Sequence, residues 1–335
     1  MIRKISIVFA SIMCISILTA CNSVKTDSST LNAAKEIAQS KQGAFNLEKG
    51  TVTLNNGVVM PALGLGTFTL SPAQTEESVY NALITGVRLI DTANAYMNER
   101  AVGRGIKRSG VPREDIFITT KLWPSGYEDA AKAIDETLTR LDLEYIDLLL
   151  LHQPFGNYTE GYRAMEIALK EGKIRSIGLS NFFEERFDEI MNIATIPPAV
   201  LQIELNPFVH QSEMREYIKP YGTVLNAWFP LGGRGNTQTM FNNEIIAAIA
   251  QAHGKTSAQV VLRWHLQAGS IAIPGSSNAN HIRENFSIFD FELTDEEMHR
   301  IKTLDRGQGS FEFRNLDGDA RFSSFTAPRD FNDQE

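Results

Sequence analysis

The chain is poor in cysteine. Cys14 and Cys21 are its only two, and both lie within the first 21 residues. The remainder therefore has neither a disulfide framework nor thiol ligands for a metal ion. The six histidines show no HExxH pattern and no paired ligand spacing, so we expect no structural or catalytic metal.

The sequence also lacks an excess of positive charge and a complete dinucleotide fingerprint. Its formal net charge is -8, and no Lys/Arg-rich run interrupts this acidity, which argues against a nucleic-acid partner. No GxGxxG opens a helix. The nearest approach, Gly64-Leu65-Gly66, lacks the third glycine, so a Rossmann nucleotide site is disfavoured.

No apolar run is long enough for a comfortable membrane span. The longest, ISIVFASIMCISIL, has about 14 residues, follows Arg3 and Lys4, and leads into Leu18-Thr19-Ala20-Cys21. This is the layout of an export signal. The LTAC motif resembles the bacterial lipobox, which implies lipidation of Cys21.

The chain therefore divides into four segments: a lipoprotein signal peptide (1–21), a flexible tether (22–46), the main folded unit (47–305), and a C-terminal loop or tail (306–335). The predicted location is the bacterial cell envelope, with the lipid on Cys21 as the only membrane contact. The rival interpretation is an uncleaved anchor or a misassigned start, and without the signal the protein would be cytoplasmic.

Local signals become strong from Thr51 onward. In TVTLNNGVVM, two short β runs flank Asn56-Gly57, which predicts a hairpin with a type I′ turn. Ser71-Pro72 then predicts a helix that continues to Ala82, with Ser71 as the N-cap.

Eight β-rich runs alternate with helical stretches through the rest of the chain. The runs are 62–66, 87–91, 115–122, 145–151, 174–180, 199–205, 223–228 and 270–274, and helical stretches include 129–141, 161–171, 184–193 and 242–253. The later runs are nearly continuous in Ile, Leu and Val, as expected of strands buried on both faces. A doubly wound open sheet shares the alternation, but it would not explain why polar candidates follow nearly every strand. We therefore predict a single-domain α/β fold, a (β/α)8 TIM barrel preceded by the N-terminal β-hairpin.

Four residues near strand ends are candidates for catalysis: Asp91, Tyr96, Lys121 and His152. Each has an ordinary interpretation alone, as a helix N-cap, a half-buried phenol, a solvated strand end and a core histidine. A parallel barrel would bring them to one mouth. Embedded in DTANAYMNE, ITTKLW and LLLLHQP, the set resembles the catalytic tetrad of the aldo-keto reductase superfamily, and the resemblance extends over roughly residues 51–305.

The resemblance implies NAD(P)H-dependent reduction of aldehydes or ketones, as in bacterial reductases acting on 2,5-diketo-D-gluconate. Tyr96 would donate a proton to the carbonyl oxygen, and Lys121 would lower the pKa of that phenol. Asp91 would anchor Lys121, and His152 would direct the carbonyl oxygen toward the phenol. Phe68, Trp123 and His152 would line the substrate mouth for a small carbonyl compound, and the C-terminal loop or tail (306–335) would contribute to that pocket. The resemblance further implies that the N-terminal β-hairpin plugs the bottom of the barrel.

The resemblance also implies a nicotinamide cofactor, NADP(H) before NAD(H). Trp228 would stack on the nicotinamide, although a Trp at that place could equally serve barrel packing. The family normally has a lysine at Gly275 and an arginine at His281, which weakens the case for NADP, and Val87 replaces a usual aromatic. The implied cofactor positions are Gly66, Thr67, Asp91, Ser180, Asn181, Gln202, Trp228, Leu231, Gly232, Ser276, Ser277, His281, Glu284 and Asn285.

A rival function is a cofactor-sensing or interaction module on the same scaffold, with little turnover, like the potassium-channel β subunits of this superfamily. The intact tetrad argues against it, because a purely structural descendant has little need of all four residues. No stripe of apolar residues suggests a dimer, so we expect a monomer.

Overall fold

The computed structural model describes residues 43–233, 235–310, 324 and 326–335. Its central feature is a sheet of eight strands, each paired in parallel with its neighbour in chain order. Parallel bridges from Leu63 to Ala272 and from Gly66 to Gly275 join the first strand segment to the last and close the barrel. The strands are β4 (Leu65–Gly66), β5 (Leu89–Asp91), β6 (Phe117–Leu122), β7 (Leu148–Leu151), β8 (Ile177–Ser180), β9 (Val200–Glu204), β10 (Val224–Trp228) and β11 (Ser270–Ala272).

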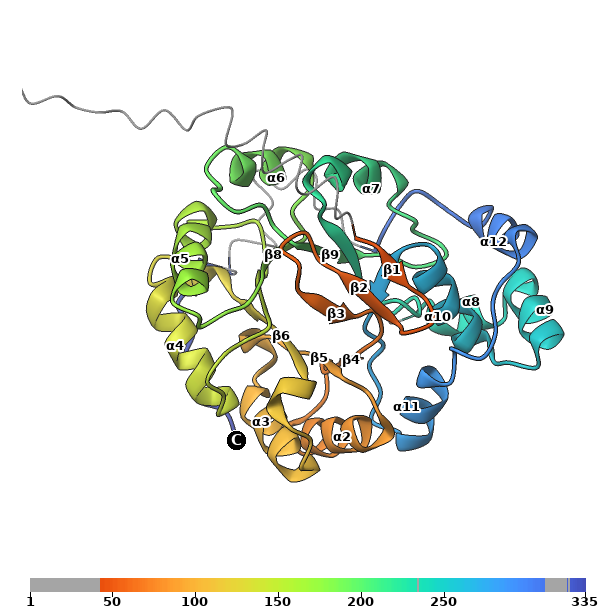
Figure 1. The fold of residues 1–335 in the computed structure, drawn as a ribbon, viewed down its shortest axis with the longest axis horizontal. Helices are drawn as coiled ribbons and strands as arrows, with labels where there is room; N and C mark the ends of the chain where they lie inside the picture. Colours follow the sequence, from red (N-terminus) through yellow and green to blue (C-terminus); the bar gives the residue numbers. More distant parts are fainter. Residues whose placement is uncertain (1–42, 234, 311–323, 325) are drawn as a thin grey trace, which may run out of the picture.

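Helices surround this barrel, as Figure 1 shows. They are α2 (Pro72–Thr85), α3 (Glu99–Ser109), α4 (Ala130–Leu141), α5 (Tyr158–Lys170), α6 (Glu184–Met191), α7 (Ser212–Ile218), α8 (Thr237–Phe241), α9 (Glu244–His253), α10 (Ser257–Gln267), α11 (Ala279–Phe286) and α12 (Asp295–Lys302). Short 3-10 turns are η1 (Asn94–Tyr96), η2 (Arg113–Asp115), η3 (Pro124–Gly126) and η4 (Lys219–Tyr221). The predicted single-domain (β/α)8 barrel is thereby confirmed, and helices α4, α5, α6 and α9 occupy the helical stretches expected from the sequence.

The first helix shows how local sequence sets its ends. Ser71 accepts a hydrogen bond from the Gln74 amide, and the Gln74 side chain accepts one from the Ser71 amide, so a capping box begins α2. Gly86, in the left-handed region at φ 106°, ends it. The helix continues to Thr85, three residues past the predicted end.

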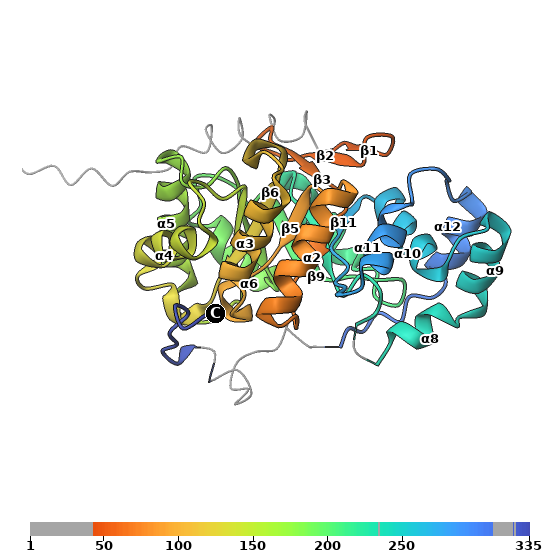
Figure 2. The same ribbon diagram turned by 90° about the horizontal axis from the view of Figure 1, so that it is seen from below.

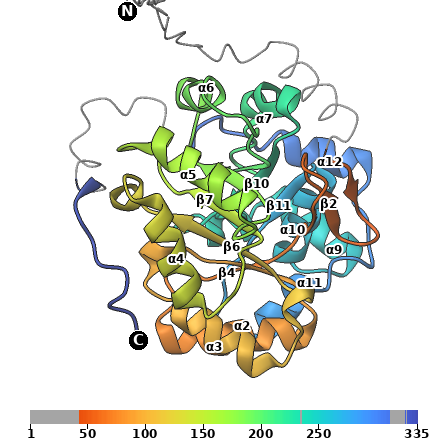
Figure 3. The same cartoon turned by 60° about the vertical axis from the view of Figure 1, so that its left-hand side comes forward.

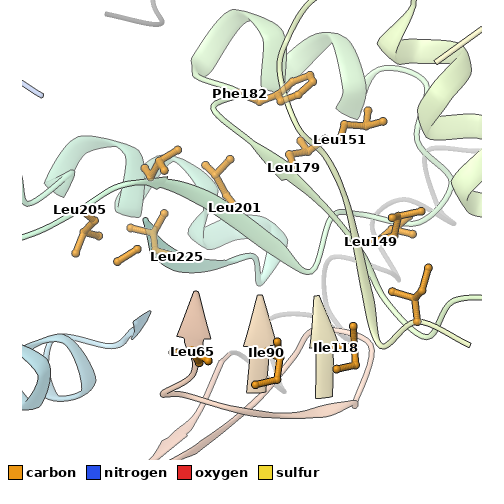
Figure 4. Close-up of a cluster of buried hydrophobic side chains, with 14 of the residues drawn as sticks. Leu65, Ile90, Ile118, Leu149, Leu151, Leu179, Phe182, Leu201, Leu205 and Leu225 are labelled. Atoms are coloured by element: carbon orange, nitrogen blue, oxygen red, sulfur yellow. The ribbon is translucent and has the colours of Figure 1, made fainter. Parts of the chain in front are cut away.

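The strands are buried on both faces. Their outward side chains pack against the helices, and Figure 4 shows this layer, with Ile90, Ile118, Leu149, Leu179 and Leu201 from the successive strands β5 to β9. Inward side chains at the amino ends of the strands form a second apolar cluster. The polar side chains of the candidate site lie toward the carboxyl ends of the strands.

The N-terminal plug is a three-stranded antiparallel sheet of β1 (Phe45–Asn46), β2 (Thr51–Thr53) and β3 (Val59–Pro61). The predicted type I′ turn is wrong. The Leu54 amide donates to the Val58 carbonyl and the Gly57 amide to the Leu54 carbonyl, while only Gly57 of the loop residues has a positive φ. The loop is thus a three-residue connection with Gly57 in the left-handed position of a bulge.

The plug lies across the amino end of the barrel, at the end opposite α8 in Figure 2. Val52, Leu54 and Met60 are fully buried against inward side chains of the strands. The Asn55 side chain donates to the Pro198 and Tyr221 carbonyl oxygens at 3.0 and 3.1 Å, so the loop tip is fixed to the turns that precede β9 and β10.

The two chain ends differ from the predicted segmentation. Phe45 and Asn46, assigned from sequence to the tether, pair with β2. The predicted signal and Cys21 lie outside the described residues, as do residues 311–323 of the C-terminal segment. No described helix combines the length and apolarity needed to cross a bilayer. Residues 326–335 run along the outside of the barrel beside α4 (Figure 3), where Arg140 donates to the Asn332 side chain at 2.9 Å.

Candidate active site

The four catalytic candidates lie together at the carboxyl end of the barrel. Asp91 is the last residue of β5, Lys121 lies near the end of β6, and His152 directly follows β7. Tyr96 is supplied by η1, one short turn beyond β5. Residues that are far apart in the sequence thus form one cluster, because neighbouring parallel strands end side by side.

Lys121 is the centre of this cluster. Its Nζ donates to Asp91 Oδ1 at 2.5 Å, to the Thr92 carbonyl oxygen at 2.8 Å and to Tyr96 Oη at 3.2 Å. The three donors of the ammonium are therefore all used, which fixes the side chain between the carboxylate and the phenol.

Asp91 is held from both sides. Its second carboxylate oxygen accepts from Gln202 Nε2 at 2.7 Å. Burial raises the pKa of Asp91, and Lys121 and Gln202 act against that rise. Burial also opposes the charge on Lys121, but Asp91 and Tyr96 outweigh it and raise the pKa of the ammonium. Lys121 therefore remains a cation inside the barrel.

The pKa of Tyr96 is shifted in the direction opposite to the expected one. Burial raises the pKa of Tyr96 above its usual 10, and the charge of Lys121, which lowers it as expected, is the smaller influence. The expectation of a lowered pKa for Tyr96 is therefore wrong, although Lys121 acts in the expected direction. The phenol is fully protonated at neutral pH, which is the state that an acid catalyst needs.

His152 is also uncharged. Burial, reinforced by the charge of Lys121, lowers the pKa of His152 well below its ordinary value. Its ring lies 5.7 Å from the Tyr96 ring and 5.0 Å from the Trp123 ring, edge-on to both. Its Nδ1 is buried without a hydrogen-bond partner among the described residues. Because Nδ1 is buried, Nε2 is the ring nitrogen of this neutral imidazole that a polar group on a substrate could reach.

An amide-rich group lies next to the tetrad at the ends of β8, β9 and β10. Asn181 Oδ1 accepts from the indole Nε1 of Trp228 at 2.9 Å, and Asn181 Nδ2 lies 3.3 Å from Ser180 Oγ. Asn181 adopts φ 65°, a left-handed conformation that asparagine tolerates better than most residues. Asn181 thus bonds the half-buried indole, and Ser180 and Gln202 on the neighbouring strands add side-chain donors and acceptors of the kind that a carboxamide group requires.

The remaining cofactor candidates fall into two groups. Gly66 and Thr67 serve the barrel itself: a Cβ at Gly66 would lie 2.7 Å from the Ile273 carbonyl oxygen, and the Thr67 amide donates to the Asp91 carbonyl at 3.0 Å. The rest lie beyond β10 and β11, in the loop after Trp228 and around α11, and are Leu231, Gly232, Ser276, Ser277, His281, Glu284 and Asn285. Their contact with a cofactor stays a prediction.

Aromatic rings gather around Tyr96. The Phe68 ring, with 49% of the residue exposed, lies 5.0 Å from the Tyr96 ring and 6.2 Å from Phe229. The predicted mouth residues Phe68 and Trp123 thus do approach the tetrad. Their contact with substrate stays a prediction.

Sequence reasoning missed several residues that shape this site. Asn98 is buried and bonds to the Thr67 carbonyl, the Thr75 hydroxyl and the Thr92 hydroxyl, which ties the β4–α2 loop to β5. The Thr92 carbonyl, which binds Lys121, carries no side-chain signal at all. Phe229 could have been noticed only as a bulky residue beside Trp228. In the part of the chain described here, no group of His, Cys, Asp and Glu could hold a metal ion.

Comparison with known proteins agrees with this geometry. The family model described as "Aldo/keto reductase family" matches residues 62–306. Glyoxal reductase of Bacillus subtilis is 45% identical over 264 residues, covering 78% of this chain and 94% of the relative. Morphine 6-dehydrogenase of Pseudomonas putida is 43% identical over 270 residues, covering 76% and 91%.

Solved structures show the same barrel. An aldo-keto reductase from a Medee basin deep-sea metagenome library matches with a TM-score of 0.76 at 40% identity, covering 80% of this chain and 99% of the other. The Bombyx mori aldo-keto reductase in complex with NADP matches with a TM-score of 0.74 at 32% identity, covering 78% and 94%. The chain belongs to the aldo/keto reductase family.

Proposed function

We propose that this chain reduces aldehydes and ketones to alcohols, with Tyr96 as the proton donor and NADPH as the preferred hydride source. The observation that carries the proposal is the Asp91–Lys121–Tyr96 chain of hydrogen bonds beside a neutral His152. A bound nicotinamide supplies the hydride, and the protein supplies orientation and the proton.

The residues present fit such a cofactor. Ser180, Asn181 and Gln202 would hold the carboxamide, and Trp228 would stack on the ring. The protonated phenol of Tyr96 gives its proton to the carbonyl oxygen while Lys121 stabilises the phenolate that forms. Asp91 and Gln202 keep Lys121 in place. His152 orients the carbonyl oxygen by a hydrogen bond from its imidazole.

Tyr96→Phe tests the proton donor. Turnover should fall at least about hundredfold, while the dissociation constant for NADPH, measured by quenching of tryptophan fluorescence, stays nearly unchanged. Tyr162→Phe is the matched control, because that buried hydroxyl donates to the Ile196 carbonyl away from the tetrad. Equal turnover in Tyr96→Phe would remove it as the acid. A wild-type protein that binds NADPH but reduces no carbonyl compound would favour the cofactor-sensing alternative.

The preference for NADPH over NADH is the finer part of the proposal. Ser276, Ser277 and Arg283 support it, and Gly275 weakens it. A Cβ at Gly275 would lie 3.1 Å from the Gly66 carbonyl oxygen at the barrel closure, so His281→Arg is the cleaner probe. It should tighten NADPH binding and leave NADH binding unchanged. Tighter binding of NADH than NADPH by the wild type would refute the preference.

We infer that the substrates are small carbonyl compounds. The support is the mouth formed by Phe68, Trp123 and His152, together with the relatives named for glyoxal and morphine. A panel containing methylglyoxal, a nitrobenzaldehyde and 2,5-diketo-gluconate covers small, aromatic and sugar-derived carbonyls. The protein itself is proposed to be a monomer. Light scattering on the purified chain would measure its molar mass and so check this state. A dimer would contradict that state but not the chemistry.

We also propose that the protein is carried to the bacterial cell envelope and lipidated on Cys21. The support is the LTAC motif after an apolar run. Mass spectrometry of the membrane fraction should find a diacylated N-terminal cysteine, and Cys21→Ala should release the protein from that fraction. An unmodified, uncleaved N-terminus in the soluble fraction would refute lipidation.

A further inference from the structure

Phe229, directly after β10, adopts an unusual backbone conformation. Its φ is 51°, in the left-handed region, where a bulky side chain is uncommon and costs free energy relative to glycine. The following loop is shaped around its ring, because a Cβ on Gly233 would collide with it. A residue kept in a disfavoured conformation, with a glycine facing its ring, points to a use for that ring.

The ring is part of a continuous aromatic row across the mouth of the barrel. Its centroid lies 5.1 Å from that of Trp228, edge-on, and 6.2 Å from that of Phe68. Phe68 in turn lies 5.0 Å from Tyr96. The row thus runs from the predicted nicotinamide-stacking ring to the proton donor, along one side of the space that a reacting carbonyl compound must enter.

We propose that Phe229 is a specificity-determining residue that favours carbonyl substrates with a flat aromatic substituent over small aliphatic ones. This inference rests on the proposed reductase function and adds the substrate class. With Phe68 it forms an apolar wall on which an aromatic substituent can stack while its carbonyl oxygen reaches Tyr96 Oη.

The preference arises because the wall of Phe229 and Phe68 makes more favourable contacts with an aromatic substrate than with a small aliphatic one. An aromatic ring gains offset or edge-on contacts with Phe229 and Phe68 in addition to burying apolar surface. Methylglyoxal has no ring to stack on this wall and little apolar surface to bury against it. Phe229 should therefore act on the KM of aromatic substrates and leave the proton transfer from Tyr96 unchanged.

The test compares 4-nitrobenzaldehyde with methylglyoxal in the full-length chain. For Phe229→Ala we expect kcat/KM to fall at least about tenfold for the aromatic aldehyde, mainly through KM, and less than about threefold for methylglyoxal. Phe229→Tyr keeps the ring and should restore the aromatic preference. Phe289→Ala is the matched control, since Phe289 is 41% exposed and lies beside Gly50 of the plug.

Phe229→Gly separates a functional ring from a structural one. Glycine adopts the left-handed conformation freely, so this variant should fold at least as well as Phe229→Ala, as thermal unfolding would show. The same loss of aromatic preference in both variants supports the proposal. Unchanged selectivity in both overturns it.

Two further outcomes are distinguishable. If Phe229→Ala weakens NADPH binding and lowers kcat/KM equally for both aldehydes, the ring contacts the cofactor, and only this inference fails. If the wild type binds NADPH but reduces neither aldehyde nor any other carbonyl compound in the panel, the proposed function fails and this inference fails with it.

Discussion

His265, on α10, makes the stability of this barrel dependent on pH. Its side chain is fully buried, with Nε2 3.1 Å from the Pro230 carbonyl oxygen and Nδ1 3.3 Å from Ser270 Oγ. A carbonyl oxygen can only accept, so Nε2 carries the hydrogen and the neutral ring satisfies its environment. Burial, aided by the charges of Arg215 and His210, lowers the pKa of His265 to about 3.

The direction of this pH dependence follows from the different proton affinities of His265 in the folded and unfolded chains. The unfolded chain binds a proton at this histidine near its ordinary pKa of 6.5, and the folded chain binds it only near pH 3. The stabilisation is therefore complete above pH 6.5 and is lost as the pH falls toward 3. The cost approaches about 1.4 kcal/mol per pH unit in the middle of that window and is half of this at pH 6.5, where only half of the unfolded chains carry the proton. His265 therefore accounts for about 2 kcal/mol between pH 6.5 and 4.5.

The assay is urea denaturation of the wild type and His265→Gln at pH 6.5 and 4.5. Glutamine keeps an N–H donor for the Pro230 carbonyl but does not titrate. The wild type should lose about 2 kcal/mol more free energy of unfolding than the variant between the two pH values. The buried histidines His152 and His210 are present in both proteins and cancel.

A second histidine variant serves as the control for the urea experiment. His253→Gln removes a histidine that pairs with Glu297 near the surface, and it should not reproduce the effect of His265→Gln. Equal losses of stability in wild type and His265→Gln would show that His265 accepts its proton equally in the folded and unfolded chains. The physical account of its burial would then be wrong.

Three other substitutions test the geometry of the site and of the barrel. Asp91→Asn leaves the buried ammonium of Lys121 without its counter-charge, so the free energy of unfolding in urea should drop by about 3–5 kcal/mol and kcat should collapse; unchanged stability would contradict the pair. Gly66→Ala places a Cβ 2.7 Å from the Ile273 carbonyl oxygen, and calorimetry should register a loss of about 1–3 kcal/mol; an unaltered melting temperature would refute the steric argument. Asn98→Leu strips several buried groups of their partner, so it should destabilise by about 1–3 kcal/mol or more and raise KM, whereas a stable variant with normal KM would show that this hub is dispensable.

The barrel could be predicted from sequence because its signals are repeated and local. Runs such as LLLL at 148–151 are continuously apolar, as expected of strands buried on both faces, and eight β-rich runs alternate with helices. The same alternation brings Asp91 and Lys121 together, since Asp91 ends β5 and Lys121 lies next to the end of the adjacent β6. Residues whose position follows from a strand end were therefore within reach of sequence reasoning.

Contacts that depend on a side chain's surroundings were not predictable. Asn56-Gly57 is compatible with more than one hairpin loop, and fixation of the neighbouring Asn55 to Pro198 and Tyr221, more than 140 residues away, accompanies the three-residue form. Asn98 is an ordinary polar residue in sequence and becomes a hub only when two loops fold over it. Such long-range partners leave no periodic trace.

The pKa of Tyr96 is another property that could not be predicted from the sequence. Lys121 acts in the expected direction, but burial is the larger influence, and burial cannot be read from a sequence. With the pKa of Tyr96 raised above 10, the phenol stays protonated throughout the neutral range. Carbonyl reduction at saturating NADPH should therefore be constant between about pH 6 and 9 as far as Tyr96 is concerned.

Oxidation of the alcohol product needs the phenolate as base, and its fraction rises tenfold per pH unit below the pKa. Stopped-flow rates in both directions over this range would check the asymmetry, with Tyr96→Phe as the control that removes it. A reduction rate that halves before pH 8 would mean that the bound cofactor lowers the pKa of Tyr96 into the neutral range. In that case the charge of Lys121, not burial, would set the proton affinity of Tyr96 during turnover.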